Sequence, residues 1–222
     1  MPNWCENVLT FEGSSADVYR FVLKAKGINP QYLCNTTQQY MWSAVPDEEI
    51  KSLVRTFNPD FGSSTDFSFH NFVPVPVEVQ RAPYDSNSAK VVAAAFDDPD
   101  YVSPEGGYSW QTKNWGTKWG VDLAHAVSYV GEEPTPEYLS STKGPITSVK
   151  FYFDSAWGPP VPVVRAISEA FPDAGVTLEY EERGMWFAGR MIMESGEIIE
   201  DVSFEPEPHE DEDEVESEDN RI

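Results

Sequence analysis

The sequence is poor in the residues that most often carry metal and redox chemistry. It has two cysteines, Cys5 and Cys34, and three scattered histidines among 222 residues. Two cysteines are too few for a disulfide framework or for the roughly four ligands of an iron–sulfur cluster, and no CxxC pair indicates zinc. We therefore expect a protein without a metal or cofactor, in which both cysteines are small hydrophobic residues.

Long apolar runs and nucleotide-binding motifs are also missing. No stretch approaches the roughly 20 apolar residues of a membrane helix, and residues 1–13 lack the basic-then-apolar order of a secretory signal. The P-loop, GxGxxG and GxSxG patterns do not occur. We expect a soluble cytoplasmic protein that does not contact a membrane.

Basic residues are scarce. The chain has 15 of them against 38 acidic residues, and its net charge is −23 at pH 7. The segment 205–222 holds ten acidic residues and one basic one, and we expect this low-complexity tail to be disordered. The remaining body keeps 28 acidic and 14 basic residues, so it should repel nucleic acid. Such acidity favours a partner with a basic surface, although it also serves solubility alone.

Strand and helix patterns alternate along the chain. Residues 5–12 read as a strand with Cys5, Asn7, Leu9 and Phe11 on one face. A capping-box-like Ser14 and Asp17 then begin a helix, for which Gly27 is the predicted C-terminal stop. The other predictions are a helix after Pro46, a strand at 66–76, a helix at 89–96, a strand at 148–154, a helix after Pro162 with Val163, Ile167, Ala170 and Phe171 buried, and strands at 176–182, 185–194 and 198–204.

This order of elements predicts an α+β fold. Two βα units around one antiparallel sheet give the ferredoxin-like plan, in which two helices pack on one face of four strands. We expect one domain over residues 1–204, with helical or loop inserts at about 28–65 and 84–107 and extra C-terminal strands. An apolar group at Tyr40, Met41 and Trp42 belongs to the first insert.

Three residue clusters stand out together. They are Asn3-Trp4-Cys5-Glu6-Asn7, then Tyr108-Ser109-Trp110 with Asn114-Trp115-Gly116-Thr117-Lys118-Trp119, and then Phe153 to Pro160 with Gly184 to Gly189. Their order and spacing, over most of residues 2–195, resemble the YubB-type family with a ferredoxin-like domain. Members of that family occur on bacteriophage genomes and conjugative plasmids, so the resemblance implies the fold and a mobile-element origin. It implies no reaction and no catalytic residue.

The tryptophans of these clusters allow two interpretations. Trp4, Trp110, Trp115, Trp119 and Trp157 would form, with Asn114 beside them, an aromatic platform on which a small nucleotide stacks. Lys118 would then contact phosphate. Alternatively the same rings are a satellite core, with Trp115 and Trp119 buried against Trp4 and Trp157, and Lys118 lies over a ring.

Two acidic residues raise a similar choice. Glu6 and Asp154 would be an acid–base pair or a magnesium site, or else Glu6 pairs with Lys118 or another basic residue while Asn7 satisfies backbone groups. No nucleophile or third ligand stands at a readable spacing, which favours the structural interpretation.

Together these features favour a binding protein over an enzyme. We expect a non-enzymatic accessory protein of a phage or plasmid that binds and modulates a host bacterial protein with a basic surface, in the host cytoplasm, and a counter-defence inhibitor is one form of this. One alternative is an acidic DNA-mimic decoy of a nucleic-acid-binding enzyme. Another is a small-nucleotide binder that uses the tryptophans.

Overall fold

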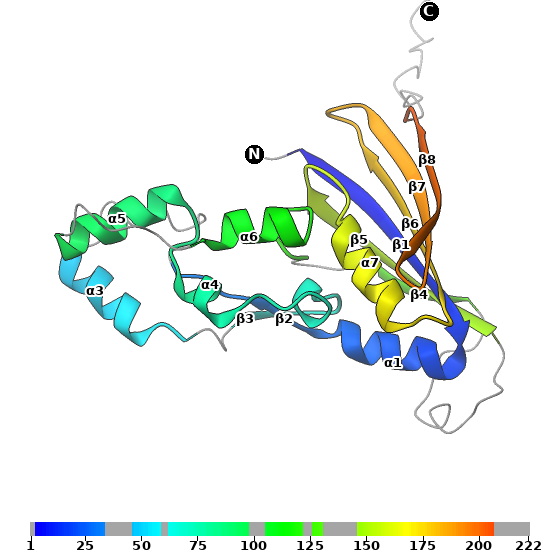
Figure 1. The fold of residues 1–222 in the computed structure, drawn as a ribbon, viewed down its shortest axis with the longest axis horizontal. Helices are drawn as coiled ribbons and strands as arrows, with labels where there is room; N and C mark the ends of the chain where they lie inside the picture. The colour runs from blue at the N-terminus through cyan, green and yellow to red at the C-terminus, as the bar shows by residue number, and fades with distance from the viewer. Residues whose placement is uncertain are drawn as a thin grey trace, which may run out of the picture.

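A six-stranded antiparallel sheet in the order β4-β5-β1-β6-β7-β8 is the centre of the fold (Figure 1). The computed structural model describes residues 3–33, 46–58, 62–97, 105–121, 126–130 and 146–206. The strands of this sheet are β1 (Trp4–Ser14), β4 (Ala126–Val130), β5 (Ile146–Ala156), β6 (Gly175–Glu182), β7 (Phe187–Glu194) and β8 (Glu197–Phe204).

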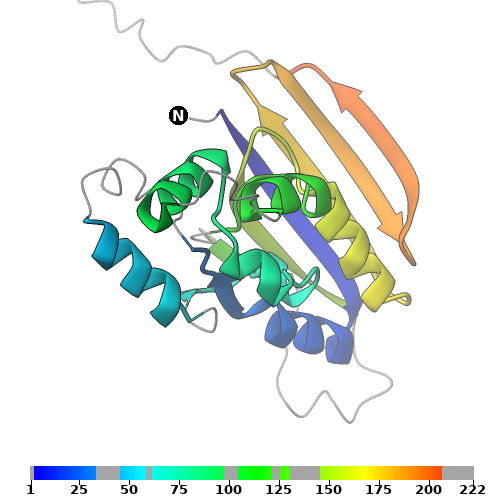
Figure 2. The ribbon, with the colours of Figure 1, turned by 60° about the vertical axis from the view of Figure 1, so that its left-hand side comes forward.

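The arrangement is α+β and ferredoxin-like, as predicted. Two helices, α1 (Ser15–Ala25) and α7 (Val161–Ala170), alternate with β1, β4, β5 and β6 along the chain. These four strands lie side by side in the order β4-β5-β1-β6, and β7 and β8 extend the sheet beyond β6. Figures 1 and 2 show α1 and α7 on one face of the sheet, and no described helix covers the other face. We call this second face the open face.

Strand β1 lies in the middle of the sheet, between β5 and β6. Cys5, Asn7, Leu9 and Phe11 are all buried on the helix-covered face, as the alternation predicts. The ring of Phe11 stacks on Phe21 of α1, with centroids 4.3 Å apart. These contacts fix the orientation of every other side chain of the strand.

Helix α1 begins at the predicted cap. The Asp17 amide donates to Ser14 Oγ at 3.1 Å, and the Ser14 hydroxyl donates to the Asp17 carboxylate at 2.5 Å. The helix stops where predicted, since Lys26 is its C-cap and Gly27, the next residue, begins the short strand β2 (Gly27–Pro30). Gly27 is needed there for close approach, since a Cβ atom would lie 2.4 Å from Asn71 Nδ2.

The strand predicted at 66–76 is wrong. Instead β3 (Gly62–Thr65) pairs with β2 as a separate two-stranded sheet, and Phe69–Asn71 forms a 3-10 turn, η2. The apolar spacing misleads because Phe67 and Phe69 turn into the same core. The ring of Phe67 lies 5.0 Å from that of Phe153, and the ring of Phe69 lies 5.9 Å from it.

In the described part of the segment between α1 and β4 there are four α-helices. They are α3 (Asp47–Thr56), α4 (Val77–Arg81), α5 (Ser86–Phe96) and α6 (Gly107–Asn114). The helix after Pro46 is confirmed, and the predicted helix at 89–96 begins earlier, because the Asp85 side chain accepts from the amides of Asn87 and Ser88. The helices α4 and α6 escape the sequence prediction. A small second core of Leu33, Ile50, Val92 and Ala95 joins α3 to α5.

The C-terminal half follows the prediction closely. Strands β5 to β8 and helix α7 all form, although Ala170 is exposed rather than buried. Ser195 and Gly196 both have positive φ, 49° and 81°, as a tight β7–β8 hairpin requires. The pairing of β7 with β8 is shifted between Ile192 and Met193, so that Ile199 forms a bulge.

Some expectations concern residues outside the described part of the chain. These are the apolar group at Tyr40, Met41 and Trp42, the second cysteine Cys34, and the acidic tail from residue 207 onward. Among the described helices, none has the length and apolar composition that crossing a membrane requires.

Replacing Phe67 with alanine tests whether the segment between α1 and β4 shares the core of the sheet. Because Phe67 is fully buried among four other phenylalanine rings, we expect Phe67→Ala to lower the free energy of unfolding by about 3–5 kcal/mol. The exposed Leu23 of α1 provides the control, and Leu23→Ala should cost less than about 0.5 kcal/mol. Urea denaturation measures both, and equal effects would contradict a shared core.

Candidate functional site on the open face of the sheet

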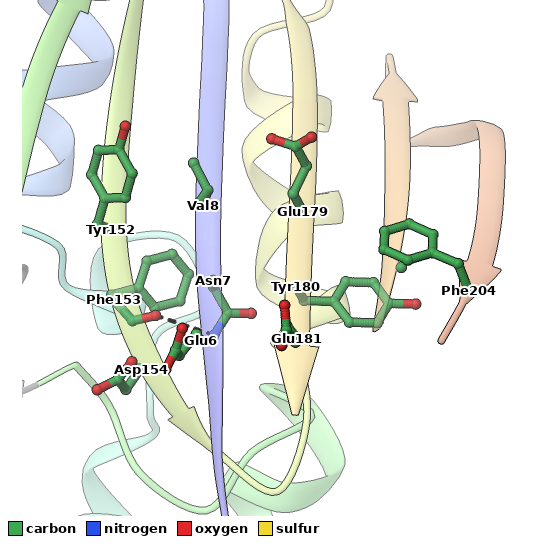
Figure 3. Close-up of a pocket in the computed structure, with 11 residues that line it drawn as sticks. Glu6, Asn7, Val8, Tyr152, Phe153, Asp154, Glu179, Tyr180, Glu181 and Phe204 are labelled. Atoms are coloured by element: carbon green, nitrogen blue, oxygen red, sulfur yellow. Dashed lines mark hydrogen bonds between the residues drawn. The ribbon is translucent and has the colours of Figure 1, made fainter. Parts of the chain in front are cut away.

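Three carboxylates lie side by side on the open face. Strand pairing places Glu6 of β1 directly opposite Asp154 of β5 on one side and Glu181 of β6 on the other. Adjacent strands in a sheet are about 4.8 Å apart, so these side chains form a row across three strands. We call Glu6, Asp154 and Glu181 the acidic row, and Figure 3 shows them at neighbouring positions.

The acidic row borders a shallow cavity of about 480 Å³. Glu179 adds a fourth carboxylate, two residues before Glu181 on the same face of β6. The rings of Tyr152 and Phe204 also line the cavity, from β5 and β8 (Figure 3). The cavity thus combines negative charge with exposed aromatic surface.

Two arginines lie near these carboxylates, since Arg183 pairs with Glu181 and Arg190 stands opposite Glu179 in the pairing of β6 with β7. Arg183 Nε lies 2.5 Å from Glu181 Oε1, and Arg190 pairs with Glu200 rather than with the row. Among the described residues no ion pair joins Glu6 to Lys118, so the predicted pairing of these two does not form. Within that same part of the chain, no group of three or more histidine, cysteine, aspartate or glutamate residues is suited to hold a metal ion. Glu6 therefore stands between two like charges without a described counter-ion.

Asn7 lies on the opposite face of β1 and has a structural role. Its side-chain amide is buried and donates to the Cys5 carbonyl at 2.7 Å, to Ser155 Oγ at 2.8 Å and to the Phe153 carbonyl at 3.3 Å. These bonds tie β1 to β5 beneath the acidic row. The side chain of Asn7 therefore cannot contact a ligand that is bound on the open face.

Cys5 is also buried under the sheet. Burial, and then the nearby charge of Glu182, raise the pKa of the Cys5 thiol to about 12. The thiol is therefore protonated at neutral pH and is not a nucleophile. The expectation of a small buried hydrophobic residue is confirmed for Cys5.

Two of the predicted platform tryptophans belong to the main core. Trp115 is fully buried, its ring meets Phe69 and Trp110 edge to face, and its indole N–H donates to the Val73 carbonyl at 2.9 Å. Trp110 is buried as well, and the Asn114 amide donates to the Trp110 carbonyl at 2.8 Å. These residues therefore lie neither on a platform nor in a satellite core, because the core they join is that of the sheet.

The other three tryptophans meet around Lys118. Trp4 and Trp119 have ring centroids 5.7 Å apart. Lys118 Nζ lies 4.0 Å from the ring centroid of Trp119 and 4.3 Å from that of Trp157, which is cation–π geometry on both sides. Burial lowers the pKa of Lys118. The structure thus brings Trp4, Lys118, Trp119 and Trp157 together beside the acidic row.

Sequence reasoning missed half of the cavity. Glu179, Glu181, Tyr152 and Phe204 were not singled out as site residues, although Glu179 and Glu181 stand two apart in an alternating strand and must share a face. That spacing was the available signal. The pairing that sets Glu181 opposite Glu6 depends on the tertiary register and leaves no local signal.

Comparison with known proteins supports the fold. Residues 137–220 match the family described as "Ferredoxin-like domain in Api92-like protein". The crystal structure of a protein api92 from Yersinia pseudotuberculosis is similar with a TM-score of 0.56 and 11% sequence identity, and the alignment covers 94% of this chain and 100% of that one. At this identity the likeness concerns the fold alone. No curated protein matches the chain in sequence.

Neutralising the centre of the acidic row should stabilise the protein. Because Glu6 has a carboxylate opposite it on both neighbouring strands, we expect Glu6→Gln to raise the free energy of unfolding by about 0.5 kcal/mol. Glu12 is the matched control, since it lies on the same strand but opposite Ser148 and Gly175. Urea denaturation at low salt should show a gain for Glu6→Gln alone, and 1 M salt should reduce it. No gain at low salt would mean that the row is not under repulsion.

The thiol of Cys5 should be inert in the folded protein. In a Cys34→Ser background, which leaves Cys5 as the one thiol of the sequence, we expect no alkylation by iodoacetamide between pH 7 and pH 9, far below the raised pKa of about 12. Mass spectrometry after timed incubation measures the labelling, and unfolding in urea provides the positive control. Rapid labelling under native conditions would show that β1 opens readily.

Proposed function

We propose that this protein is a non-enzymatic binding protein that holds a basic segment of another protein on the open face of its sheet. One observation carries the proposal: a cavity with four carboxylates and two aromatic rings lies on a sheet face that no described helix covers. Lysine and arginine side chains fit such a surface, since carboxylates bind their charge and aromatic faces attract cations.

The cost of assembling the acidic row supports a binding role. Like charges opposite each other destabilise a sheet, and Glu6 stands opposite a carboxylate on both neighbouring strands. A cationic partner would remove that repulsion when it binds. Surface charge that costs stability is better explained by recognition than by solubility, for which any exposed position would serve.

The composition of the cavity argues against catalysis by a serine, cysteine or lysine nucleophile or by a histidine base. The residues that line it are glutamate, aspartate, asparagine, tyrosine, phenylalanine, valine and glycine, so they include no histidine, cysteine, serine or lysine. The nearby thiol of Cys5 is buried on the other face and protonated. A binding function accounts for the lining without requiring a reaction.

The resemblance to the YubB-type family supports a more specific setting. We propose that the protein is an accessory protein of a phage or conjugative plasmid, that it acts in the bacterial cytoplasm, and that its partner is a host protein, of which a defence component is one form. A DNA-mimic decoy is a special case, in which the basic partner is a nucleic-acid-binding enzyme. The fixed positions of the carboxylates on a sheet suit that case, because a mimic needs charges held at a regular spacing like that of phosphates.

A small nucleotide is the second candidate ligand. The exposed Trp4 and Trp157 beside Lys118 favour it, because indole rings stack on bases and a lysine attracts phosphate. Two features weigh against it. Lys118 already fills the space between Trp119 and Trp157, and the adjacent acidic row would repel phosphate.

Charge removal at the cavity should abolish capture of the partner. We expect the full chain to retain one stoichiometric protein from bacterial lysate at moderate salt, and the triple variant Glu6→Gln, Glu179→Gln, Glu181→Gln to retain at least about tenfold less, because each lost charge pair weakens binding. Quantitative mass spectrometry of the captured proteins measures the ratio.

The matched control removes the same charge elsewhere. Glu49, Glu78 and Glu105 are exposed and lie between α1 and β4, so Glu49→Gln, Glu78→Gln, Glu105→Gln should leave capture intact. Equal losses in both triple variants would mean that bulk charge alone binds partners and would contradict the proposal. Release of the captured protein by duplex DNA would identify the decoy case.

A further inference from the structure

Four large apolar side chains are exposed together at one end of the sheet. Trp4 is 46% exposed, Trp157 44%, Met185 70% and Trp186 48%. We call these four residues the aromatic patch. Single exposed hydrophobic residues are ordinary on protein surfaces, but a contiguous group of tryptophan and methionine is the composition of a protein-binding surface.

Asn3 is the point at which the parts of the patch converge. The Trp157 amide donates to the Asn3 carbonyl at 2.9 Å, which holds the end of β5 against the start of β1. Gly184, in the β6–β7 turn, packs so closely on the Asn3 side chain that a Cβ atom there would lie 2.7 Å from Nδ2. Trp4 and Met185 follow Asn3 and Gly184 directly in the sequence, so three separate elements meet here.

Two residues of the patch have a strained backbone. Trp157 has φ 73° and Trp186 has φ 59°, in the left-handed region that favours glycine and is an outlier for a bulky side chain. Both residues nevertheless remain about half exposed. Strained residues persist where the conformation itself has a use.

Two residues of the patch, Trp4 and Trp157, are held in place before any partner binds. Lys118 lies between the rings of Trp119 and Trp157, and Trp119 in turn contacts Trp4. Tyr108 meets the ring of Trp157 edge to face, with centroids 6.2 Å apart. Ordered aromatic side chains lose little conformational freedom on binding, which favours tight contact.

The acidic row lies directly beside the patch. Glu6 follows Trp4 by two residues on the same face of β1, and Glu181 precedes the turn that carries Met185 and Trp186. The two surfaces are therefore continuous, apolar at the end of the sheet and negative next to it. An anionic membrane or a nucleic acid would be repelled by this combination.

We infer that the aromatic patch anchors a protein segment in which a large apolar side chain is flanked by lysine or arginine. The inference rests on the proposed function and assigns a different part of the binding to each of the two surfaces. The acidic row attracts the basic residues and speeds association, whereas the patch buries the apolar side chain and slows dissociation.

A random twelve-residue peptide display library, selected against the full chain, provides the probe. Selected peptides should combine an aromatic or large aliphatic residue with at least two basic residues. We measure the best of them by surface plasmon resonance against Trp157→Gly and Trp186→Gly. Glycine removes each ring and suits positive φ, so both variants should fold at least as well as the parent chain.

The two surfaces should change different rate constants. We expect each glycine variant to raise the dissociation rate constant about tenfold or more and to leave the association rate constant within about twofold. Glu6→Gln with Glu181→Gln should instead lower the association rate constant several-fold at low salt. Leu23→Ala and Phe96→Ala, which alter exposed apolar residues outside the patch (53% and 41% exposed), should change neither constant.

Unchanged dissociation in both glycine variants, or selected peptides that are basic but lack large apolar residues, would overturn the anchor. The proposed function would survive that result if the charge variants still slowed association. Selection of acidic or uncharged peptides would overturn both. Thermal denaturation of each variant confirms that a lost interaction is not a lost fold.

Discussion

The placement of β1 at the middle of the sheet is the constraint on which the rest of the molecule depends. Its side chains alternate, so burial of Leu9 and Phe11 against the helices necessarily turns Glu6 and Trp4 to the open face. A slip of one residue would exchange the two sets, exposing the core and burying a carboxylate. The hydrogen bonds of the Asn7 amide to strand β5 secure the register at this point. The register of β1 therefore determines both which residues form the core and which residues form the candidate site.

The long segment between α1 and β4 is bound into this arrangement by aromatic rings. Phe67, Phe69 and Trp115 all reach the core that lies between the sheet and its helices. Their removal from water is a strong stabilising contribution, since each aromatic side chain buries a large area. The same segment carries Lys118 and Trp119 to the edge of the open face, where they support Trp4 and Trp157. The packing of this segment on the helix-covered face therefore also positions residues at the edge of the open face.

Local patterns predicted the strands of the sheet and most helices, because alternation and capping are local properties. They failed at Phe67 and Phe69, whose spacing suits a strand although both rings enter the core from a turn. Local patterns also failed to predict that Trp115 and Trp119 are buried to different extents. Gly116 between them has φ 80°, and after this turn Trp115 is fully buried in the core whereas Trp119 packs partly buried against it. Which carboxylates face Glu6 is likewise a property of the register, which no single segment contains.

The outer edge of β8 has a consequence for self-association. Two copies could pair their β8 strands edge to edge and antiparallel, with residues of the same face opposite each other. The two registers with the most residue pairs would place Glu200 opposite Glu200 of the other copy, or Asp201 opposite Asp201 of the other copy. Like charges at such positions disfavour pairing, and the bulge at Ile199 twists the strand away from a neighbour. An exposed strand with Ile199, Val202 and Phe204 would otherwise be a template for aggregation. The charges and the bulge of β8 thus act against edge-to-edge assembly through this strand.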